Sequence, residues 1–261
     1  MVLERMIAAT QLKNQPDVAM FIGFIFVLVG FITSFLIFVT GMSVAMIGLS
    51  SMLMVPYAMK ILNLEKSRYR SVFSKENGAV KFYSFLFFGM AFAYTILFGV
   101  LNPKTLQIAF KSQLDIIGAP LASSVAGAFA TNWSLFYQII SNNLTIIVVL
   151  ILLSFVYGTG SIFVLNYNAS IAGIVYGSIL NAFIWGGIPL FAYPWLYLPH
   201  TILEILAYLL AAVAGSILSK PLTKRYKSLI YRDFSLLFAA AVLLVILGGY
   251  VEVTVPFAFL Q

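Results

Sequence analysis

The sequence predicts an all-α fold, a polytopic transmembrane helical bundle of about seven spans, and three observations support this class. Of the 261 residues, 62% are hydrophobic and 9% are charged, whereas soluble domains carry about 25% charged residues. Seven apolar segments are each long enough for a membrane-spanning helix of about 20 residues. Basic residues gather in alternate connecting segments, as in multi-pass membrane proteins. We therefore expect one integral membrane domain over residues 1–261.

The first two apolar segments, residues 18–40 and 41–62, follow each other with almost no loop and predict an N-terminal helical hairpin. Pro56 is expected to kink the second helix, because proline removes a backbone hydrogen bond from a helix interior. In an alternative arrangement, residues 18–62 form two re-entrant half-spans. That arrangement keeps the same charge asymmetry and leaves five full spans.

A third span is predicted at residues 82–101, and the segment after it, residues 103–141, differs from a span. Its apolar residues share one helical face and its charged residues fall largely elsewhere, a pattern typical of an amphipathic helix at the membrane surface. We therefore expect residues 103–141 to form an interfacial segment on the outer side of the membrane. The apolar face at its start comprises Leu106, Phe110, Leu114 and Ile117.

Small residues predict how the later spans pack against one another. Gly173, Gly177 and Asn181 recur every four residues in the fifth span, and glycines at this spacing let another helix approach closely. The sixth span carries a matching narrow face that ends at Gly215. We expect the fourth, fifth and sixth spans to form one compact bundle. The last four spans are predicted at residues 143–165, 169–191, 199–220 and 234–251.

The distribution of charge predicts the orientation in the membrane. In this arrangement, the segments on the N-terminal side carry 13 lysines and arginines and the opposite side carries 2. Basic loops remain on the cytoplasmic side of a membrane. We therefore expect a multi-pass protein of the cell membrane with its N-terminus in the cytoplasm and its C-terminus outside. The net charge of +7 is explained by this topology and by contact with the lipid bilayer, and no nucleic-acid partner is predicted.

The sixth span contains the most unusual polar residues of the chain, His200 and Glu204. His200 is the only histidine, and Glu204 is the only acidic residue with a long apolar run on both sides. Their spacing of four places both side chains on one helical face. Because an ionisable group inside a membrane is costly, it indicates a functional site by default. Three interpretations remain open: structural pinning of the helix, a ligand or metal site with both residues as ligands, and a titrating or catalytic role.

Asparagines add to this predicted site. Asn142 and Asn143 open the fourth span at a depth similar to that of His200, where they can cap the helix or reach across to another one. Asn181 lies near the middle of the fifth span and needs a hydrogen-bond partner there. The predicted polar cluster comprises Asn142, Asn143, Asn168, Asn181, His200 and Glu204.

The sequence lacks the residues or motifs that several kinds of site require. The absence of cysteine excludes disulfides and thiolate metal sites. A single histidine cannot build an ordinary zinc protease site, and neither a P-loop nor a G-x-S-x-G motif occurs. No catalytic residue is assigned and no cofactor is predicted, apart from His200 and Glu204 as candidate metal ligands.

The order of the polar residues along residues 135–220 resembles the SpoIIM family (stage II sporulation protein M, or DUF95). The residues that carry the resemblance are the Asn142-Asn143 pair, Asn168, His200 and Glu204. Ala169 and Thr201 stand where the family pattern has glycine. The resemblance implies an integral membrane protein that, in spore-forming bacteria, is an assembly partner in a complex with cell-wall hydrolases.

The function predicted from these observations is that of a non-enzymatic scaffold or assembly partner of a membrane complex, with a polar cluster near the outer leaflet. Other membrane proteins are its expected partners, and the small-residue faces favour a homodimer. One alternative is a transporter or channel for a small solute, an ion or a lipid. Another is a metal-dependent membrane enzyme in which His200 and Glu204 supply ligands or a base.

Overall fold

The computed structural model of the chain describes residues 15–38, 40–67, 78–117, 132–186, 194–219 and 227–259. Within these ranges every regular element is a helix. Seven of the helices are long and apolar enough to cross a membrane, which confirms the predicted all-α class and the number of spans. The helices are α3 (Pro16–Ile37), α4 (Met42–Ser67), α5 (Gly78–Val100), α6 (Pro103–Ala109), α8 (Asn132–Tyr157), α9 (Ser161–Trp185), α10 (Pro194–Leu218) and α11 (Lys227–Phe259).

The N-terminal hairpin consists of two full-length helices rather than two half-spans. The membrane-capable parts of α3 and α4 are each 22 residues long, which corresponds to about 33 Å at 1.5 Å per residue. Gly41, which precedes α4, has a φ of 72°, a left-handed conformation that glycine adopts without strain. Pro56 lies inside α4, as predicted.

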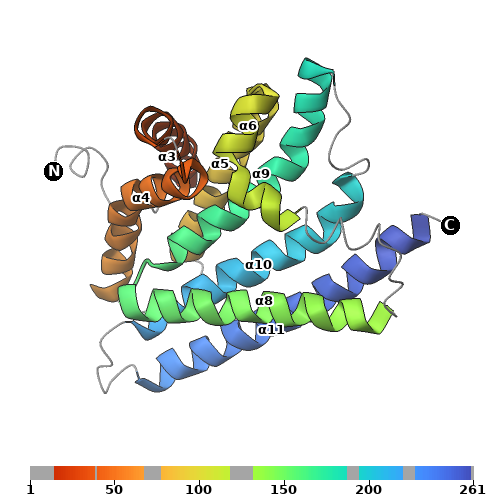
Figure 1. Cartoon of the computed structure of the whole chain (residues 1–261). Coiled ribbons are helices and arrows are strands. Elements are labelled where there is room, and N and C mark those ends of the chain that lie inside the picture. The colour runs from red at the N-terminus through yellow and green to blue at the C-terminus, as the bar shows by residue number, and fades with distance from the viewer. Residues whose placement is uncertain are drawn as a thin grey trace.

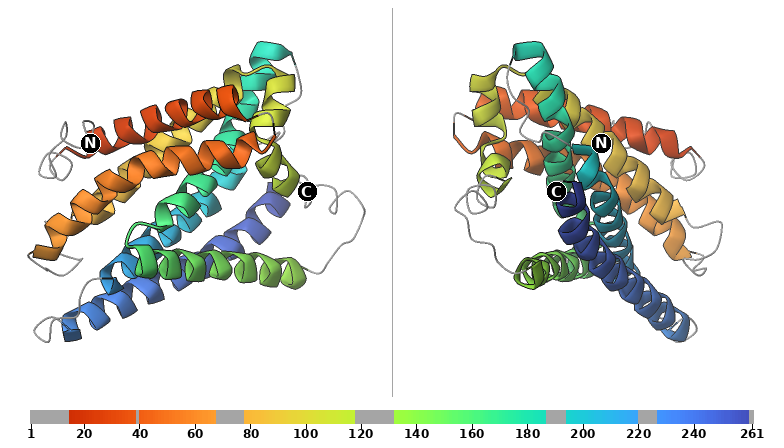
Figure 2. Two further views of the ribbon diagram at one scale, coloured as in Figure 1. Left: turned by 60° about the vertical axis from the view of Figure 1, so that its left-hand side comes forward. Right: turned by 90° about the vertical axis from the view of Figure 1, so that its right-hand side faces the viewer.

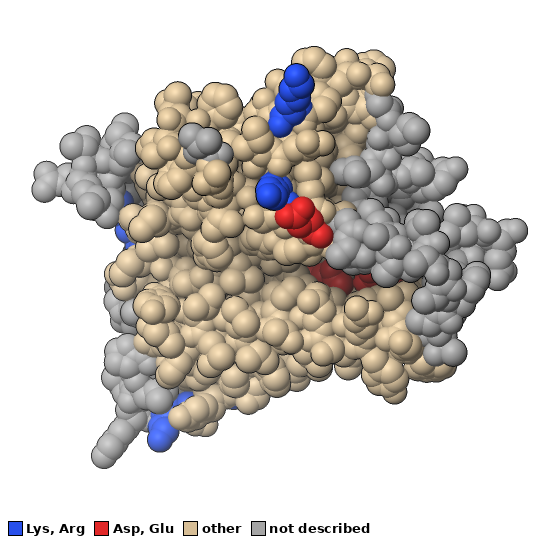
Figure 3. Space-filling model, in the orientation of Figure 1, with Lys and Arg blue, Asp and Glu red and all other residues tan. Residues whose placement is uncertain are grey.

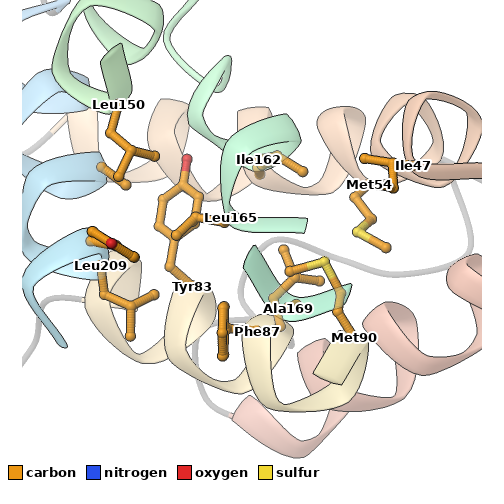
Figure 4. Close-up of a cluster of buried hydrophobic side chains, with 14 of the residues drawn as sticks. Ile47, Met54, Tyr83, Phe87, Met90, Leu150, Ile162, Leu165, Ala169 and Leu209 are labelled. Carbon is orange, nitrogen blue, oxygen red and sulfur yellow. The ribbon is translucent and has the colours of Figure 1, made fainter. Parts of the chain in front are cut away.

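The long helices form two groups that meet along α5 and α9 (Figure 1). In the first group α5 packs against α3 and α9, and α4 packs against α3. In the second group α10 packs against α8 and α11. Side chains from both groups meet around Tyr83 of α5, which lies near Leu165 of α9, Leu150 of α8 and Leu209 of α10 (Figure 4). This buried apolar layer joins the two groups.

The turn between the fourth and fifth spans lies earlier in the chain than predicted. The fourth span was expected to end at residue 165, but α8 ends at Tyr157 and α9 begins at Ser161. Gly158 takes a φ of 70°, and a Cβ on Gly160 would lie 2.6 Å from the carbonyl oxygen of Leu153. These glycines make the turn, but the apolar residues on both sides concealed it in the sequence.

The predicted interfacial segment is shorter than residues 103–141. Residues 103–117 form α6 and a second short helix over residues 111–117, residues 118–131 lie outside the described residues, and residues 132–141 belong to α8. Leu106 and Phe110 are buried and Lys104 is exposed, which confirms the predicted amphipathic face. The Phe110 ring packs edge-on against Tyr94 and Phe98 of α5. Charged side chains gather over this part of the surface (Figure 3).

The glycine face of the fifth span contacts a different helix from the one predicted. A Cβ on Gly177 would lie 2.8 Å from the Cβ of Phe98 in α5. The fifth span therefore pairs mainly with the third, and the expected compact bundle of spans four, five and six is wrong in this respect. The contact between spans four and six is confirmed, because a Cβ on Gly215 of α10 would lie 2.5 Å from the Ile151 carbonyl oxygen of α8.

The two ends of the bundle are clearly distinguished in Figure 2. In its left-hand view, the start of α3, the turn between α8 and α9 and the start of α11 lie on one side. The region around α6, the start of α8 and the end of α11 lie on the other side. The start of α10 lies on the same side as α6 (Figure 2).

Candidate functional site

The candidate site lies where α10 faces α8 and α11. On α10, His200, Glu204 and Tyr208 recur every four residues and therefore share one helical face. This helix begins at Pro194 and contains Pro199, where the predicted span of residues 199–220 was expected to begin. The additional turn places His200 and Glu204 farther inside the helix than the sequence indicated.

Asn143 of α8 connects two of these side chains. It is 4% exposed, and its Nδ2 donates a hydrogen bond of 2.5 Å to Oε1 of Glu204. The Tyr208 hydroxyl donates in turn to Oδ1 of Asn143. The amide therefore uses its donor on a carboxylate and its acceptor on a phenol, and both bonds connect α8 to α10. A buried polar group that is satisfied in this way avoids the desolvation cost that it would otherwise carry.

The inner face of α8 explains why Asn143 reaches α10. Asn143, Ile147, Leu150 and Ser154 follow at helical spacing and all are buried. Near Ser154, Gly215 of α10 packs against α8 and brings the backbones of the two helices close together. The close approach of the two helices places Asn143 within hydrogen-bonding distance of Glu204.

Helix α11 closes the site from a third direction. A Cβ on Gly248 would lie 3.5 Å from Cγ of Glu204 and 3.6 Å from the backbone oxygen of His200. Glu252 follows Gly248 by one helical turn, lies on the same face of α11 and is partly buried. The space-filling view shows acidic side chains recessed in a hollow between α8 and the helices above it (Figure 3).

His200 lies at the N-terminal end of this face and is 7% exposed. Its Nε2 is 3.5 Å from the hydroxyl oxygen of Thr201, the next residue along the chain. Within the described residues, no group of three or more histidine, aspartate or glutamate side chains is arranged to hold a metal ion. A structural or catalytic zinc site takes three or four protein ligands.

The structure does not bring the other predicted asparagines to this site. Asn142 is exposed, because its side chain points about 100° away from that of Asn143 around the axis of α8. Asn168 donates to the Val164 carbonyl oxygen of its own helix, at 2.8 Å. Asn181 donates to the carbonyl oxygens of Phe98, Gly99 and Leu101 at 2.8–3.2 Å and so caps the end of α5.

Sequence reasoning missed a second polar cluster, centred on Asn166 of α9. Asn166 is fully buried, and its Nδ2 lies 2.8 Å from the Ser50 hydroxyl, 2.9 Å from the Ser51 hydroxyl and 3.2 Å from the Ile47 carbonyl oxygen. The Tyr94 hydroxyl donates to its Oδ1 at 3.0 Å. These bonds join α4, α5 and α9.

A signal for this cluster was present in the sequence. Asn166, Ser170, Gly173 and Gly177 recur at helical spacing and share one buried face of α9. Because the span boundary was placed too late, Asn166 was counted as a loop residue. The same face carries Ser170, whose hydroxyl accepts a bond of 3.1 Å from the buried Gln113.

Seven membrane-capable helices and a hydrogen-bonded carboxylate between three of them define a polytopic α-helical membrane protein with an interhelical polar site. A family model described as SpoIIM, stage II sporulation protein M, matches residues 81–255. The chain belongs to the SpoIIM family. The match covers α5 to α11 and every residue of the candidate site, whereas α3 and α4 lie outside it. No curated protein and no solved structure matches the chain.

Proposed function

We propose that this chain is a non-enzymatic scaffold of a membrane complex, in which the α8, α10 and α11 group forms a fixed platform for partner membrane proteins. The observation that carries the proposal is the hydrogen-bonded series from Tyr208 through Asn143 to Glu204. These three side chains satisfy one another across two helices. Their polar atoms are therefore used to hold the platform together.

The alternatives place different demands on Glu204. A transporter needs a carboxylate that exchanges its protein partners for a solute or ion during each cycle. A metal-dependent enzyme needs further ligands around it. The close contact of Glu204 with Asn143 and with the backbone of α11 at Gly248 favours a role in packing. We place this platform near the outer leaflet, with the N-terminus of the chain in the cytoplasm.

A flux assay separates the scaffold from a transporter. The purified full-length chain would be reconstituted in liposomes that contain fluorescent indicators for protons, sodium or potassium. We expect the flux through wild-type liposomes to equal that through empty liposomes and to be unaffected by Glu204→Gln. A cation flux that is present in the wild type and absent in Glu204→Gln would overturn the proposal in favour of transport.

A second experiment tests the scaffold role directly. The chain would be purified from its native membranes in mild detergent, and the mass of its complexes would be measured by native mass spectrometry. We expect a stoichiometric complex with at least one other membrane protein, and we expect Asn143→Leu to reduce its yield. If the wild-type chain is recovered only alone or with further copies of itself, the scaffold proposal is wrong.

A further inference from the structure

The outward face of α8 carries a line of polar side chains. Its members are all exposed, they recur at three- and four-residue spacings, and they lie on the side of α8 that faces away from α10 and α11. We call this line the α8 polar stripe. It comprises Ser134, Gln138, Ser141, Asn142 and Thr145.

Aromatic residues indicate that most of the stripe lies inside the membrane. Trp133 and Tyr137 are 69% and 68% exposed near the start of α8, and Tyr157 is 70% exposed at its end. Exposed tryptophan and tyrosine mark the two membrane–water interfaces. Tyr157 follows Tyr137 by 20 residues, a rise of about 30 Å along the helix axis, which matches the hydrocarbon core. Gln138 to Thr145 therefore lie in its outer part.

Lipid chains cannot form hydrogen bonds with these side chains. The Thr145 hydroxyl donates to the Ser141 carbonyl oxygen of its own helix at 2.8 Å. The side-chain amides of Gln138 and Asn142 each present donors and an acceptor on the exposed face. In transmembrane helices, such amides form hydrogen bonds across helix–helix interfaces.

No described helix covers the stripe. In the membrane-capable part of α8, 22% of the residues are buried, similar to the other peripheral helices α11 (28%) and α3 (33%) and lower than the 50–56% in α4, α5, α9 and α10. Figure 2 shows α8 at the edge of the molecule, with α10 and α11 on one side of it. The stripe is therefore positioned for contact with another chain in the plane of the membrane.

The chemistry of the stripe favours a second copy of the same chain. All five side chains are uncharged, and each is both a donor and an acceptor, so the surface complements itself. Two copies inserted in the same orientation bring identical faces together around a two-fold axis along the membrane normal. We propose that the protein forms a parallel homodimer in which the α8 polar stripes pair through Gln138 and Asn142. This inference goes beyond the scaffold role and does not depend on it.

Cysteine cross-linking tests the interface directly, because the chain has no native cysteine. Gln138→Cys and Asn142→Cys would be made separately in the full-length chain, purified and reconstituted alone in liposomes. Copper–phenanthroline would oxidise them, and non-reducing electrophoresis would separate monomers from dimers. We expect efficient disulfide-linked dimers from both variants.

Leu247→Cys on α11 is the matched control. Leu247 is 45% exposed and precedes Gly248, which packs against Glu204, so it lies at nearly the same depth as Asn142. We expect few dimers from this variant. Equal cross-linking at positions 142 and 247 would indicate random collision and overturn the proposal. Absence of dimers at positions 138 and 142 would overturn it too. The stripe would then face lipid, another protein or residues 118–131 of the same chain instead of a second copy.

An equilibrium measurement distinguishes a stable dimer from chains that collide briefly and are captured by the disulfide. Wild-type and Asn142→Leu chains would be labelled with donor and acceptor dyes, and energy transfer would be followed as the lipid-to-protein ratio increases. Interhelical hydrogen bonds in membranes are modest, so we expect Asn142→Leu to weaken association about three- to tenfold. Leu247→Asn, which adds an amide at the control position, should leave association unchanged. Equal association of wild type and Asn142→Leu would exclude the stripe as the interface.

Discussion

Neighbouring residues on α8 illustrate how position determines the role of an asparagine. Asn143 is buried between helices and uses both ends of its amide on Glu204 and Tyr208. Asn142 faces outward from the same turn. The two side chains are chemically identical, so the difference comes entirely from the 100° between successive residues of a helix. Replacing each of them separately can therefore isolate the contribution of the interhelical bonds.

We expect Asn143→Leu to destabilise the protein and Asn142→Leu to have little effect on its stability. The first substitution leaves a carboxylate and a phenol without their partner, and an unsatisfied buried polar group costs about 1–3 kcal/mol. Thermal unfolding in detergent, followed by circular dichroism, measures the difference between the two variants. Equal unfolding temperatures would show that the bonds to Glu204 and Tyr208 contribute nothing to folding.

A similar comparison is available on α9, where Asn166 and Asn168 are two residues apart. Asn166 bonds to α4 and accepts from α5, whereas Asn168 bonds only within its own helix. We expect Asn166→Leu to lower the unfolding temperature substantially and Asn168→Leu to lower it slightly. If limited proteolysis between α4 and α5 is no faster in Asn166→Leu than in the wild type, the cluster does not hold the N-terminal hairpin in place.

At the level of elements, glycine determines which helices approach closely. A Cβ on Gly23 of α3 would lie 2.5 Å from the Leu86 carbonyl oxygen of α5, and Gly215 makes a similar approach between α10 and α8. Lipid does not drive helices together as water does, so close packing of backbones supplies much of their association. The glycines therefore hold α3 of the N-terminal hairpin close to α5, and they hold α10, which carries Glu204, close to α8.

We expect Gly215→Ala to separate α10 from α8 and to destabilise the protein. The added methyl group would lie 2.5 Å from the Ile151 carbonyl oxygen and 2.7 Å from Cβ of Ser154, and backbone cannot move aside as a flexible side chain does. Overpacking of this kind typically costs about 1–3 kcal/mol. Gly48→Ala on α4 is the control, because its Cβ would meet no atom within 4 Å.

The unfolding temperatures of the two glycine variants provide the measurement. Since alanine has a higher helix propensity than glycine, Gly48→Ala should be neutral or slightly stabilising. An unchanged unfolding temperature for Gly215→Ala would mean that α8 and α10 have room to separate, and the close approach would then not be needed to position Asn143.

For the whole molecule, the seven membrane-capable helices of the described residues predict that the start of α3 and the end of α11 lie on opposite sides of the membrane. The basic residues predict which side is cytoplasmic. Asn102, between α5 and α6, should be outside, and Lys227, at the start of α11, should be inside. Two further cysteine variants can therefore test the orientation.

We expect Asn102→Cys to react in intact cells with a maleimide that does not cross membranes, and Lys227→Cys to react only after the cells are permeabilised. The physical reason is that only the outer position is accessible to the reagent. Mass shifts on electrophoresis would measure the labelling. The reverse pattern would place the N-terminus and the basic segments outside, together with the start of α3.

The candidate site could be predicted only in part from the sequence. Glu204 was identified because a lone acidic residue within a long apolar run is unusual. Its bond to Asn143 could not be distinguished from helix capping, because the choice depends on where α8 begins and where α10 lies; α8 begins at Asn132, so Asn143 is too far inside it to be the cap. Asn166 was missed because apolar residues flank Gly158 and concealed the turn, which moved the boundary between two helices.

The sequence by itself determined the class of the protein, the number of spans and the amphipathic character of the segment after α5, because the bilayer imposes length and polarity on each segment separately. Only the tertiary structure decided which helices are neighbours. Gly177 contacts α5 rather than α8, and Asn143 rather than Asn142 or Asn181 meets Glu204. These pairings depend on contacts between helices distant in sequence, and no single segment contains that information.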